Sequence, residues 1–192
     1  MAEADAPDTA AGADDQAASA TTAEPAANEV RVTALIRVDL EETFRIFTEE
    51  IDLWWRRGLM YRVAGKRRGV IAIEPRLGGR LFESFETRAR EKVIETGRVT
   101  VWEPPTRLVL EWRNVNFRPD ESTEVEVRFE PSKSGTSVTI VHRGWAAIRP
   151  DHPARHGLGV GAAFIRSNGM WWGGLLSGLR THAEARRGDE DS

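Results

Sequence analysis

The sequence predicts a single soluble α+β domain, in which a curved antiparallel sheet wraps around a long C-terminal helix. Three observations support this fold class. Residues 69–143 alternate between strand-like runs and turn residues, two short helical segments precede that run, and a helical apolar stripe lies near the end of the chain. The chain has 192 residues, which is enough for one packed core, and it holds no apolar run as long as a membrane span.

The two ends of the chain differ in composition from the middle. Residues 1–28 contain six acidic residues, no basic residue and no aromatic or β-branched aliphatic residue, so burial cannot offset the entropy of ordering them. We expect a disordered acidic tail over residues 1–28, a folded domain over 29–187 and a disordered acidic end over 188–192. The net charge of the whole chain is -3, so the acidic ends leave a net positive domain between them.

The domain begins with a half-buried strand and an amphipathic helix. Asp39 is a suitable N-cap, Glu42 stands at the position of its capping-box partner, and Phe44 and Phe47 follow at helical spacing. The strand before them alternates in polarity, which turns one face toward the core. That face consists of Val30, Val32, Ala34, Ile36 and Val38.

A second short helix and a run of six strands follow. The helix covers residues 49–55, and the basic, glycine-containing stretch 56–69 ends it. The strands are separated by short turns rich in Gly and Pro, so we expect neighbours in sequence to pair in antiparallel fashion. In the fifth of these strands polar residues alternate with apolar ones, so one face is buried and the other is solvated. The strands cover residues 70–74, 79–86, 92–102, 106–112, 122–130 and 136–143.

The last part of the chain combines a long loop with a long helix. Residues 144–167 are rich in Gly and Pro, and a structureless loop of that length is usually functional or mobile. Asn168 is a reasonable N-cap for the final helix. The apolar stripe of this helix consists of Trp172, Leu176, Leu179 and Ala183.

Several sequence words occur in this order of elements. They are LWW at 53–55, RLGGRLFE at 76–83, GRVTVWEPPTRLVLEW at 97–112, FEPSKSGTSVTIVHRGW at 129–145 and WWGGLLSGL at 171–179. With these words the sequence resembles the START-like SRPBCC superfamily, and within it the bacterial homologues of the heat-shock-protein-90 ATPase activator domain. The resemblance implies a helix-grip fold with a cavity between the concave sheet face and the C-terminal helix. Different members of the superfamily use that cavity for lipids, hormones, polyketide-like molecules or chemistry.

Alternation along the strands indicates which side chains line this cavity. If Leu110 and Trp112 face inward, Val127 faces them from the next strand and His142 from the one after. Large amphipathic tryptophan side chains suit an aromatic or steroid-like ligand, and an ordinary packed core is the alternative explanation for them. The predicted ligand-binding residues are Phe82, Glu95, Leu110, Trp112, Val127, His142, Trp145, Trp172 and Leu176.

His142 is the polar residue of greatest interest. Its imidazole faces inward near the long loop, where it could donate to a ligand carbonyl or act as a base. The alternative is a core histidine whose hydrogen bonds are all made within the protein. Glu95 shares its parity with Val99 and Val101, so it could face inward too and form an acid/base pair with His142.

Other chemistries are not predicted. Asp151, His152 and His156 lie among prolines in a glycine-rich loop, where their spacing has no helical geometry, so we expect no metal site. The sequence has no cysteine, and GLGVGAAF at 157–164 does not match a dinucleotide-binding loop. No serine stands in a nucleophile-elbow motif, so we predict neither catalytic residues nor a cofactor. Basic residues are spread along the chain, so we expect no nucleic-acid partner.

These observations predict a cytoplasmic, non-enzymatic protein that binds a small apolar or aromatic molecule, with residues 145–167 as a lid and no membrane partner. The cytoplasm is expected because the start MAEADAPDTA lacks the basic and apolar regions of a secretory signal. The alternative is a chaperone-linked or other protein-interaction module with a filled cavity and a working basic surface. A third hypothesis is a cyclase- or hydrolase-type enzyme with His142 and Glu95 as acid and base.

Overall fold

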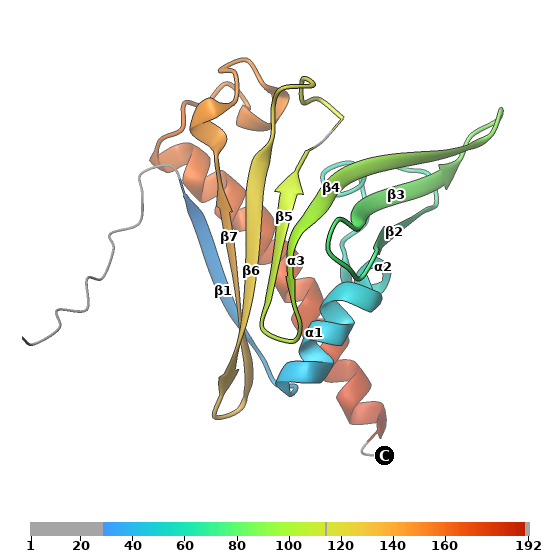
Figure 1. Ribbon diagram of the computed structural model, residues 1–192, viewed down its shortest axis with the longest axis vertical. Helices are drawn as coiled ribbons and strands as arrows, with labels where there is room; N and C mark the ends of the chain where they lie inside the picture. The colour runs from blue at the N-terminus through green and yellow to red at the C-terminus, as the bar shows by residue number, and fades with distance from the viewer. Residues whose placement is uncertain (1–28, 114, 191–192) are drawn as a thin grey trace, which may run out of the picture.

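A computed structural model describes residues 29–113 and 115–190, and its helices and strands follow the predicted order (Figure 1). The predicted acidic tail over residues 1–28 lies outside the described residues, as do residues 191–192. The strands are β1 (Val30–Ile36), β2 (Gly69–Ile73), β3 (Arg80–Glu86), β4 (Glu91–Glu103), β5 (Arg107–Trp112), β6 (Thr123–Ser132) and β7 (Gly135–Arg143). The helices are α1 (Leu40–Glu49), α2 (Ile51–Trp54), the 3-10 helices η1 (Trp145–Ala147) and η2 (Pro153–Arg155), and α3 (Ala162–Glu190).

The strands form one curved antiparallel sheet in the order β1-β7-β6-β5-β4-β3-β2. Strands β2 to β7 are a meander, and β1 closes the sheet beside β7, so the first and last strands of the sequence are neighbours (Figure 1). The long helix α3 runs along one side of this sheet, α2 lies near β2, and α1 contacts β2, β6 and β7. This arrangement confirms the predicted α+β helix-grip fold.

The register of the central strands aligns the predicted inward residues. Leu110 pairs with Val125, Val127 pairs with Ile140, and Val125 pairs in turn with His142. Paired residues of neighbouring strands point to the same face of the sheet, so these side chains form one buried layer against α3. The hydrophobic core therefore lies where the alternation predicted it.

The helix α1 begins as predicted, although its capping box is only half formed. The Asp39 carboxylate accepts a hydrogen bond of 2.9 Å from the backbone N–H of Glu42. The carboxylate of Glu42 instead accepts hydrogen bonds from the Arg45 guanidinium at 2.5 and 2.7 Å. Phe44 and Phe47 are buried, so the predicted amphipathic face packs into the core.

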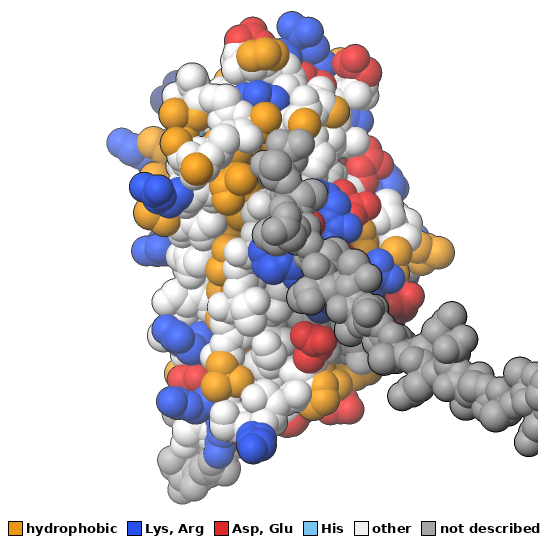
Figure 2. Space-filling view, turned by 90° about the vertical axis from the view of Figure 1, so that its left-hand side faces the viewer, with side chains coloured by type: hydrophobic (Ala, Val, Ile, Leu, Met, Phe, Trp, Pro, Cys, Tyr) orange, Lys and Arg blue, Asp and Glu red, His pale blue; other side chains and the backbone are white. Residues whose placement is uncertain are grey.

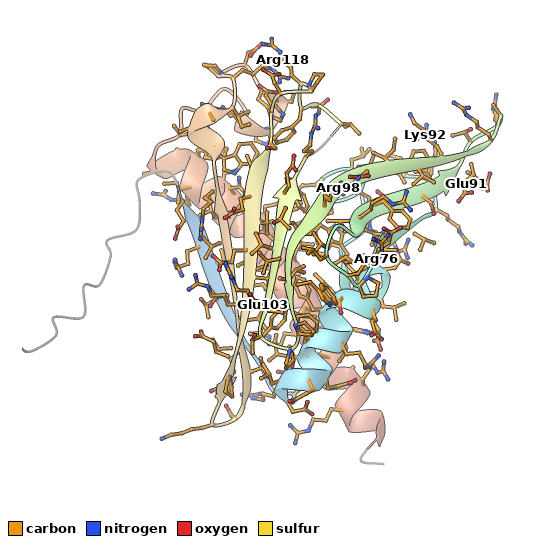
Figure 3. The ribbon with its side chains drawn as sticks, viewed as in Figure 1. Arg76, Glu91, Lys92, Arg98, Glu103 and Arg118 are labelled. Carbon is orange, nitrogen blue, oxygen red and sulfur yellow. The ribbon has the colours of Figure 1, made fainter. Side chains whose placement is uncertain are left out.

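Strand β4 contains two bulges that the sequence did not predict. Gly97 pairs with Leu81 while Glu95 pairs with Phe82, so Thr96 is an extra residue on β4. A second shift separates Val99 from Val101. Each bulge interrupts the two-residue alternation, because two residues on one strand oppose one residue on its neighbour. Beyond the first bulge the β3–β4 hairpin projects from the sheet, with Glu91 and Lys92 near its tip (Figure 3).

Two glycines are required by close backbone contacts. A Cβ atom at Gly79 would lie 2.1 Å from the carbonyl oxygen of Glu74, and one at Gly135 would lie 2.1 Å from that of Ile36. Gly135 also has a φ of 143°, a conformation that other residues rarely adopt. The turn between β2 and β3 and the β6–β7 hairpin therefore depend on these glycines.

The helix α3 is longer than predicted at both ends. It begins at Ala162 instead of Asn168, and it continues to Glu190, beyond residue 187, where we expected the domain to end and an acidic disordered end to begin. The predicted stripe of α3 is buried, and buried Phe164 extends it by two turns toward the N-terminus. The predicted loop 144–167 is consequently shorter, and η1 and η2 add structure within it.

None of the helices in the described part of the chain is long and apolar enough to cross a membrane. On the face that Figure 2 shows, Lys and Arg side chains are scattered among neutral and acidic ones, and hydrophobic side chains gather mainly in its upper part.

Candidate functional site

Four of the predicted ligand-binding residues form one aromatic cluster between the sheet and α3. Trp112 comes from β5, His142 from β7, Trp145 from η1 and Trp172 from α3. The ring of His142 lies 6.1 Å from Trp112, 5.0 Å from Trp145 and 5.8 Å from Trp172, measured between centroids. These separations are contact distances for aromatic side chains, so the rings pack against one another and fill the space between them.

His142 makes hydrogen bonds through both ring nitrogens. The indole N–H of Trp172 donates to its Nδ1 at 3.1 Å, and its Nε2 lies 2.9 Å from the Thr123 hydroxyl. Because an indole N–H can only donate, Nδ1 carries no proton, and the N–H of the neutral ring is at Nε2. Burial lowers the pKa of His142 to about 3. His142 is therefore a neutral core histidine with both of its hydrogen bonds made within the protein.

The apolar members of the predicted site also lie in this core. Leu110, Val127 and Leu176 are buried in one cluster with Trp112 and Trp172. Three surface hollows lie elsewhere: one is at the β2 edge beside Val70, one lies between α1 and the β6–β7 hairpin, and one lies over the outer face of β4 and β5. The predicted lining is thus brought together as a packed layer of side chains.

Glu95 and Phe82 do not belong to this layer, and their predicted inward orientation is wrong. The Glu95 side chain is 37% exposed and forms an ion pair of 2.7 Å with Arg98. The bulge at Thr96 reverses the parity of β4, so Glu95 no longer shares a face with Val99. Phe82 faces the same outer side, where the Arg80 guanidinium lies 5.0 Å from its ring. The acid/base pair of Glu95 with His142 is therefore not formed.

A second, smaller aromatic cluster covers one end of the space between the sheet and α3. It contains Trp145, Ile148 and Phe164 in its centre, with Phe117, Leu158 and Val160 around them. The β5–β6 loop, which carries Arg118, lies at the same end of the molecule as η1 and η2 (Figures 1 and 3). Ion pairing ties the two segments together, because Arg149 bonds the carboxylate of Glu121.

The three residues of the D-H-x-x-x-H cluster are dispersed at this end. His152 is buried, and its Nδ1 accepts a hydrogen bond of 3.1 Å from the N–H of Ala154. Asp151 is exposed and lies 3.4 Å from the Arg149 guanidinium, and His156 is exposed. Within the described residues, no group of three or more His, Asp or Glu side chains could hold a metal ion.

Exposed apolar side chains gather where the loop 56–68 meets α3. Leu59, Met60 and Met170 are 74%, 72% and 66% exposed. The indole N–H of Trp171 donates a 2.9 Å hydrogen bond to the carbonyl oxygen of Met60, and the Tyr61 ring stacks on Trp171 at 5.6 Å. We call Leu59, Met60 and Met170 the Met60–Met170 patch.

A buried ionic network holds the loop that carries this patch. The buried guanidinium of Arg62 lies 2.7 Å from the carboxylate of Asp52 and 3.7 Å from that of Glu83. Glu83 also accepts hydrogen bonds from the N–H groups of Val63 and Ala64, at 2.6 and 3.1 Å. Burial acts to raise the pKa of Asp52, but hydrogen bonds from Ile71 and Arg62 outweigh it and hold that pKa below its usual value.

Sequence reasoning missed this network, although one signal for it was available. In the predicted strand 79–86, Leu81, Glu83 and Phe85 share a parity, so the alternation that buries Leu81 buries Glu83 as well. A buried carboxylate requires a cationic or hydrogen-bonding partner. Sequence did not indicate that this partner is Arg62, because the two residues belong to separate elements.

Comparison with solved structures shows the same fold in proteins of low sequence identity. A protein from Mesorhizobium loti is 19% identical with a TM-score of 0.53, and the match covers 82% of this chain and 97% of that one. An AHSA1-like protein from Aeromonas hydrophila is 20% identical with a TM-score of 0.52, over 82% of this chain and 93% of that one. An HSP90 activator from Plasmodium falciparum is 17% identical with a TM-score of 0.54, over 80% and 94%.

No curated protein matches the sequence. The sequence does match a protein family, which is described as "Activator of Hsp90 ATPase homolog 1-like protein", and the match covers residues 37–164. This range begins directly after β1 and includes every later strand, three residues of the aromatic cluster (Trp112, His142 and Trp145) and the start of α3, whereas Trp172 lies beyond it. Because the matched range is more than half of the chain, the protein belongs to the Activator of Hsp90 ATPase homolog 1-like family.

Proposed function

We propose that this protein is a protein-interaction module that binds an Hsp90-class chaperone through the Met60–Met170 patch. The observation that carries the proposal is the patch itself, three large apolar side chains that are each at least 66% exposed and come from two separate elements. Large apolar side chains exposed together often mark an interaction site. The family supplies the candidate partner, since the similar Plasmodium falciparum protein is described as an HSP90 activator.

The patch is presented on a rigid support. The hydrogen bond from Trp171 to the carbonyl oxygen of Met60 joins α3 to the loop 56–68. The buried guanidinium of Arg62 also holds this loop, through ion pairs with Asp52 and Glu83. Met170 lies one turn before Gly174 on α3, and a Cβ at Gly174 would lie 2.9 Å from both the Arg56 guanidinium and the Tyr61 hydroxyl. A support of this kind lowers the entropy that binding would cost.

Charge supports a partner surface that is acidic as well as apolar. The loop 56–68 contains basic residues and no acidic residue, and Lys66, Arg67 and Arg68 are exposed on it. Arg166 is exposed one turn before Met170 on α3. Basic side chains on the same loop and helix as the apolar patch favour an acidic segment that also carries apolar residues, and they raise the rate of encounter at low salt.

The other two hypotheses have less support. Binding of a small apolar or aromatic molecule between the sheet and α3 stays a prediction, and it would require the packed rings of Trp112, His142 and Trp172 to separate. An enzyme with Glu95 and His142 as acid and base is not proposed, because these side chains lie on opposite faces of the sheet.

The test is a binding titration of the full chain with purified Hsp90, measured by calorimetry. A double variant, Met60→Glu with Met170→Glu, should weaken binding at least about tenfold, because buried apolar contacts dominate such interfaces. Binding should also weaken as the salt concentration rises. The matched control is Leu77→Glu in the turn between β2 and β3, because Leu77 is 66% exposed, as Met170 is.

Leu77→Glu should leave the dissociation constant unchanged. If the wild-type chain forms no saturable complex with Hsp90, the proposed function is refuted. If a complex forms and the double variant binds as tightly as wild type, the patch is not the contact surface.

A further inference from the structure

Buried hydrogen-bond donors without partners are concentrated in one short segment. Among the residues that the structure describes, the buried side-chain nitrogen or oxygen atoms without a hydrogen bond are Arg143 Nε, Trp145 Nε1, His152 Nε2 and Arg155 Nε. All of them are nitrogen atoms between residues 143 and 155, but Arg143 differs from the other three, because its guanidinium forms ion pairs with Glu29, Glu124 and Glu126. A buried donor without a partner destabilises the folded protein, because it has lost its hydrogen bonds to water. Such a concentration indicates an acceptor that the described residues do not supply.

Two of these donors belong to rings in mutual contact. The rings of Trp145 and His152 lie 6.1 Å apart, and the Phe117 ring contacts both, at 6.0 and 4.6 Å. The Nδ1 of His152 accepts from the N–H of Ala154, so its neutral ring carries the proton at Nε2. Trp145 and His152 therefore present two N–H donors within one aromatic cluster, and neither donor has an acceptor in the described part of the chain.

The third group in this cluster is a buried positive charge. Arg155 is only 4% exposed, and its guanidinium donates to the carbonyl oxygens of Trp145 and Ile148. No carboxylate of the described residues pairs with it, since Glu121 and the exposed Asp151 both pair with Arg149. A buried charge in a protein is normally paired with an opposite charge. The site thus lacks an anion.

The walls around these groups are apolar and aromatic. Phe164 lies 5.1 Å from Trp145, and Ile148 and Leu158 complete the cluster. A Cβ atom at Gly157, Gly159 or Gly161 would meet no other heavy atom within 4 Å, so the segment that carries Leu158 and Val160 is open at these glycines. These rings are in contact, so a ligand would have to part them, and it would combine an aromatic body with an anionic acceptor.

We propose that Trp145, His152 and Arg155 form a binding site for the carboxylate of a small aromatic acid, with Phe117 and Phe164 as walls. A carboxylate has two oxygen atoms and about four acceptor positions, enough for both ring N–H groups and the guanidinium. The site is separate from the Met60–Met170 patch and does not depend on the proposed function. Only Trp145 was among the residues that the sequence predicted to bind a ligand.

The test compares acids with their neutral amides on the wild-type chain. Benzoate, phenylacetate and indole-3-acetate are each titrated against the corresponding amide, and the tryptophan indole N–H signals are followed by ¹H–¹⁵N NMR. Formation of a hydrogen bond should move the Trp145 signal in a saturable way, at least tenfold more tightly for an acid than for its amide. The indole N–H groups of Trp55 and Trp172 already have acceptors, so their signals serve as internal controls.

Trp145→Phe assigns the signal, because the variant lacks the indole N–H while losing little volume. Arg155→Met should weaken binding of the acid and leave that of the amide unchanged. The proposal is overturned if none of the three acids moves the Trp145 signal, or if acid and amide bind equally. It is also overturned if a water molecule, seen as a cross-relaxation partner of the Trp145 N–H, stays in place when an acid is added.

Discussion

His142 should make the stability of this protein depend on pH in the mildly acidic range. Its imidazole is buried, and its Nδ1 accepts a hydrogen bond from the indole of Trp172, which only the neutral ring can do. Replacing it by Asn removes the titrating group while keeping a polar side chain. His142→Asn therefore changes how the free energy of unfolding depends on pH, in addition to any loss of stability that is the same at every pH.

The magnitude follows from the two pKa values of His142. Burial lowers its pKa from 6.5 in the unfolded chain to about 3 in the folded protein. Because the folded value is the lower one, protonation favours unfolding, and the stabilisation is present above pH 6.5 and is lost as the pH falls toward 3. At pH 5 the unfolded chain is almost fully protonated at this site and the folded protein is not. The expected loss between pH 7 and pH 5 is about 2 kcal/mol.

The assay is urea unfolding of the wild-type chain and of His142→Asn at pH 7 and at pH 5. Burial also lowers the pKa values of His152 and His182, but their contributions are common to both proteins and cancel in the difference. The free energy of unfolding of wild type should fall by about 2 kcal/mol more than that of the variant. His156→Asn is the control, since His156 is exposed and asparagine tolerates its positive φ of 49°.

The control variant should lose as much stability as wild type. If wild type and His142→Asn lose the same free energy between pH 7 and pH 5, then His142 is not held neutral in the folded protein. The interpretation of the aromatic cluster as a packed core would then be wrong.

Two further predictions concern the charged groups of the core. Arg62→Met leaves buried Glu83 without its cation and should cost about 3–5 kcal/mol in urea unfolding, whereas Arg57→Met, which removes an exposed partner of Asp52, should cost less than about 1 kcal/mol. Equal costs would contradict the assignment of Arg62 as the anchor of the loop. Burial acts to raise the pKa of Glu126, but bonds from Arg128 and Arg107 outweigh it and lower that pKa to about 2. The stabilisation from ionised Glu126 is therefore present above pH 4.5 and is lost as the pH falls toward 2. The melting temperature of Glu126→Gln should decline less than that of wild type over this range. Parallel curves of melting temperature against pH for the two proteins would refute this assignment.

The order of elements and the buried layer could be predicted because their signals are local. Alternation places Val125 and Val127 on one face of the strand 123–129, and Ile140 and His142 on one face of the strand 136–142, whatever the rest of the chain does. The family was recognised from words such as RLGGRLFE at 76–83, in which Gly79 is required by a close backbone contact. Local signals of this kind survive without knowledge of the tertiary contacts.

The candidate site could be predicted only in part. The bulge at Thr96 reversed the side to which Glu95 points, because one extra residue inverts the parity of a strand and no residue type marks it. The start of α3 was placed too late, since Asn168 is a good capping residue and the Gly- and Pro-rich segment before it hid the stripe that continues to Phe164. In both cases the pairing or packing of distant residues decided the outcome.

The sequence by itself determined the fold class, the family and the inward face of the central strands, because these depend on periodicity and turn residues. Only the tertiary structure decided that the inward rings fill the space between the sheet and α3, and that Met60 and Met170 share one surface. It also decided that the N–H groups of Trp145 and His152 have no acceptor among residues 29–113 and 115–190. The physical reason is distance along the chain: the hydrogen bond from Trp171 to the Met60 carbonyl joins residues 111 positions apart. Such contacts arise from the packing of α3 against the rest of the domain, and no local pattern encodes them.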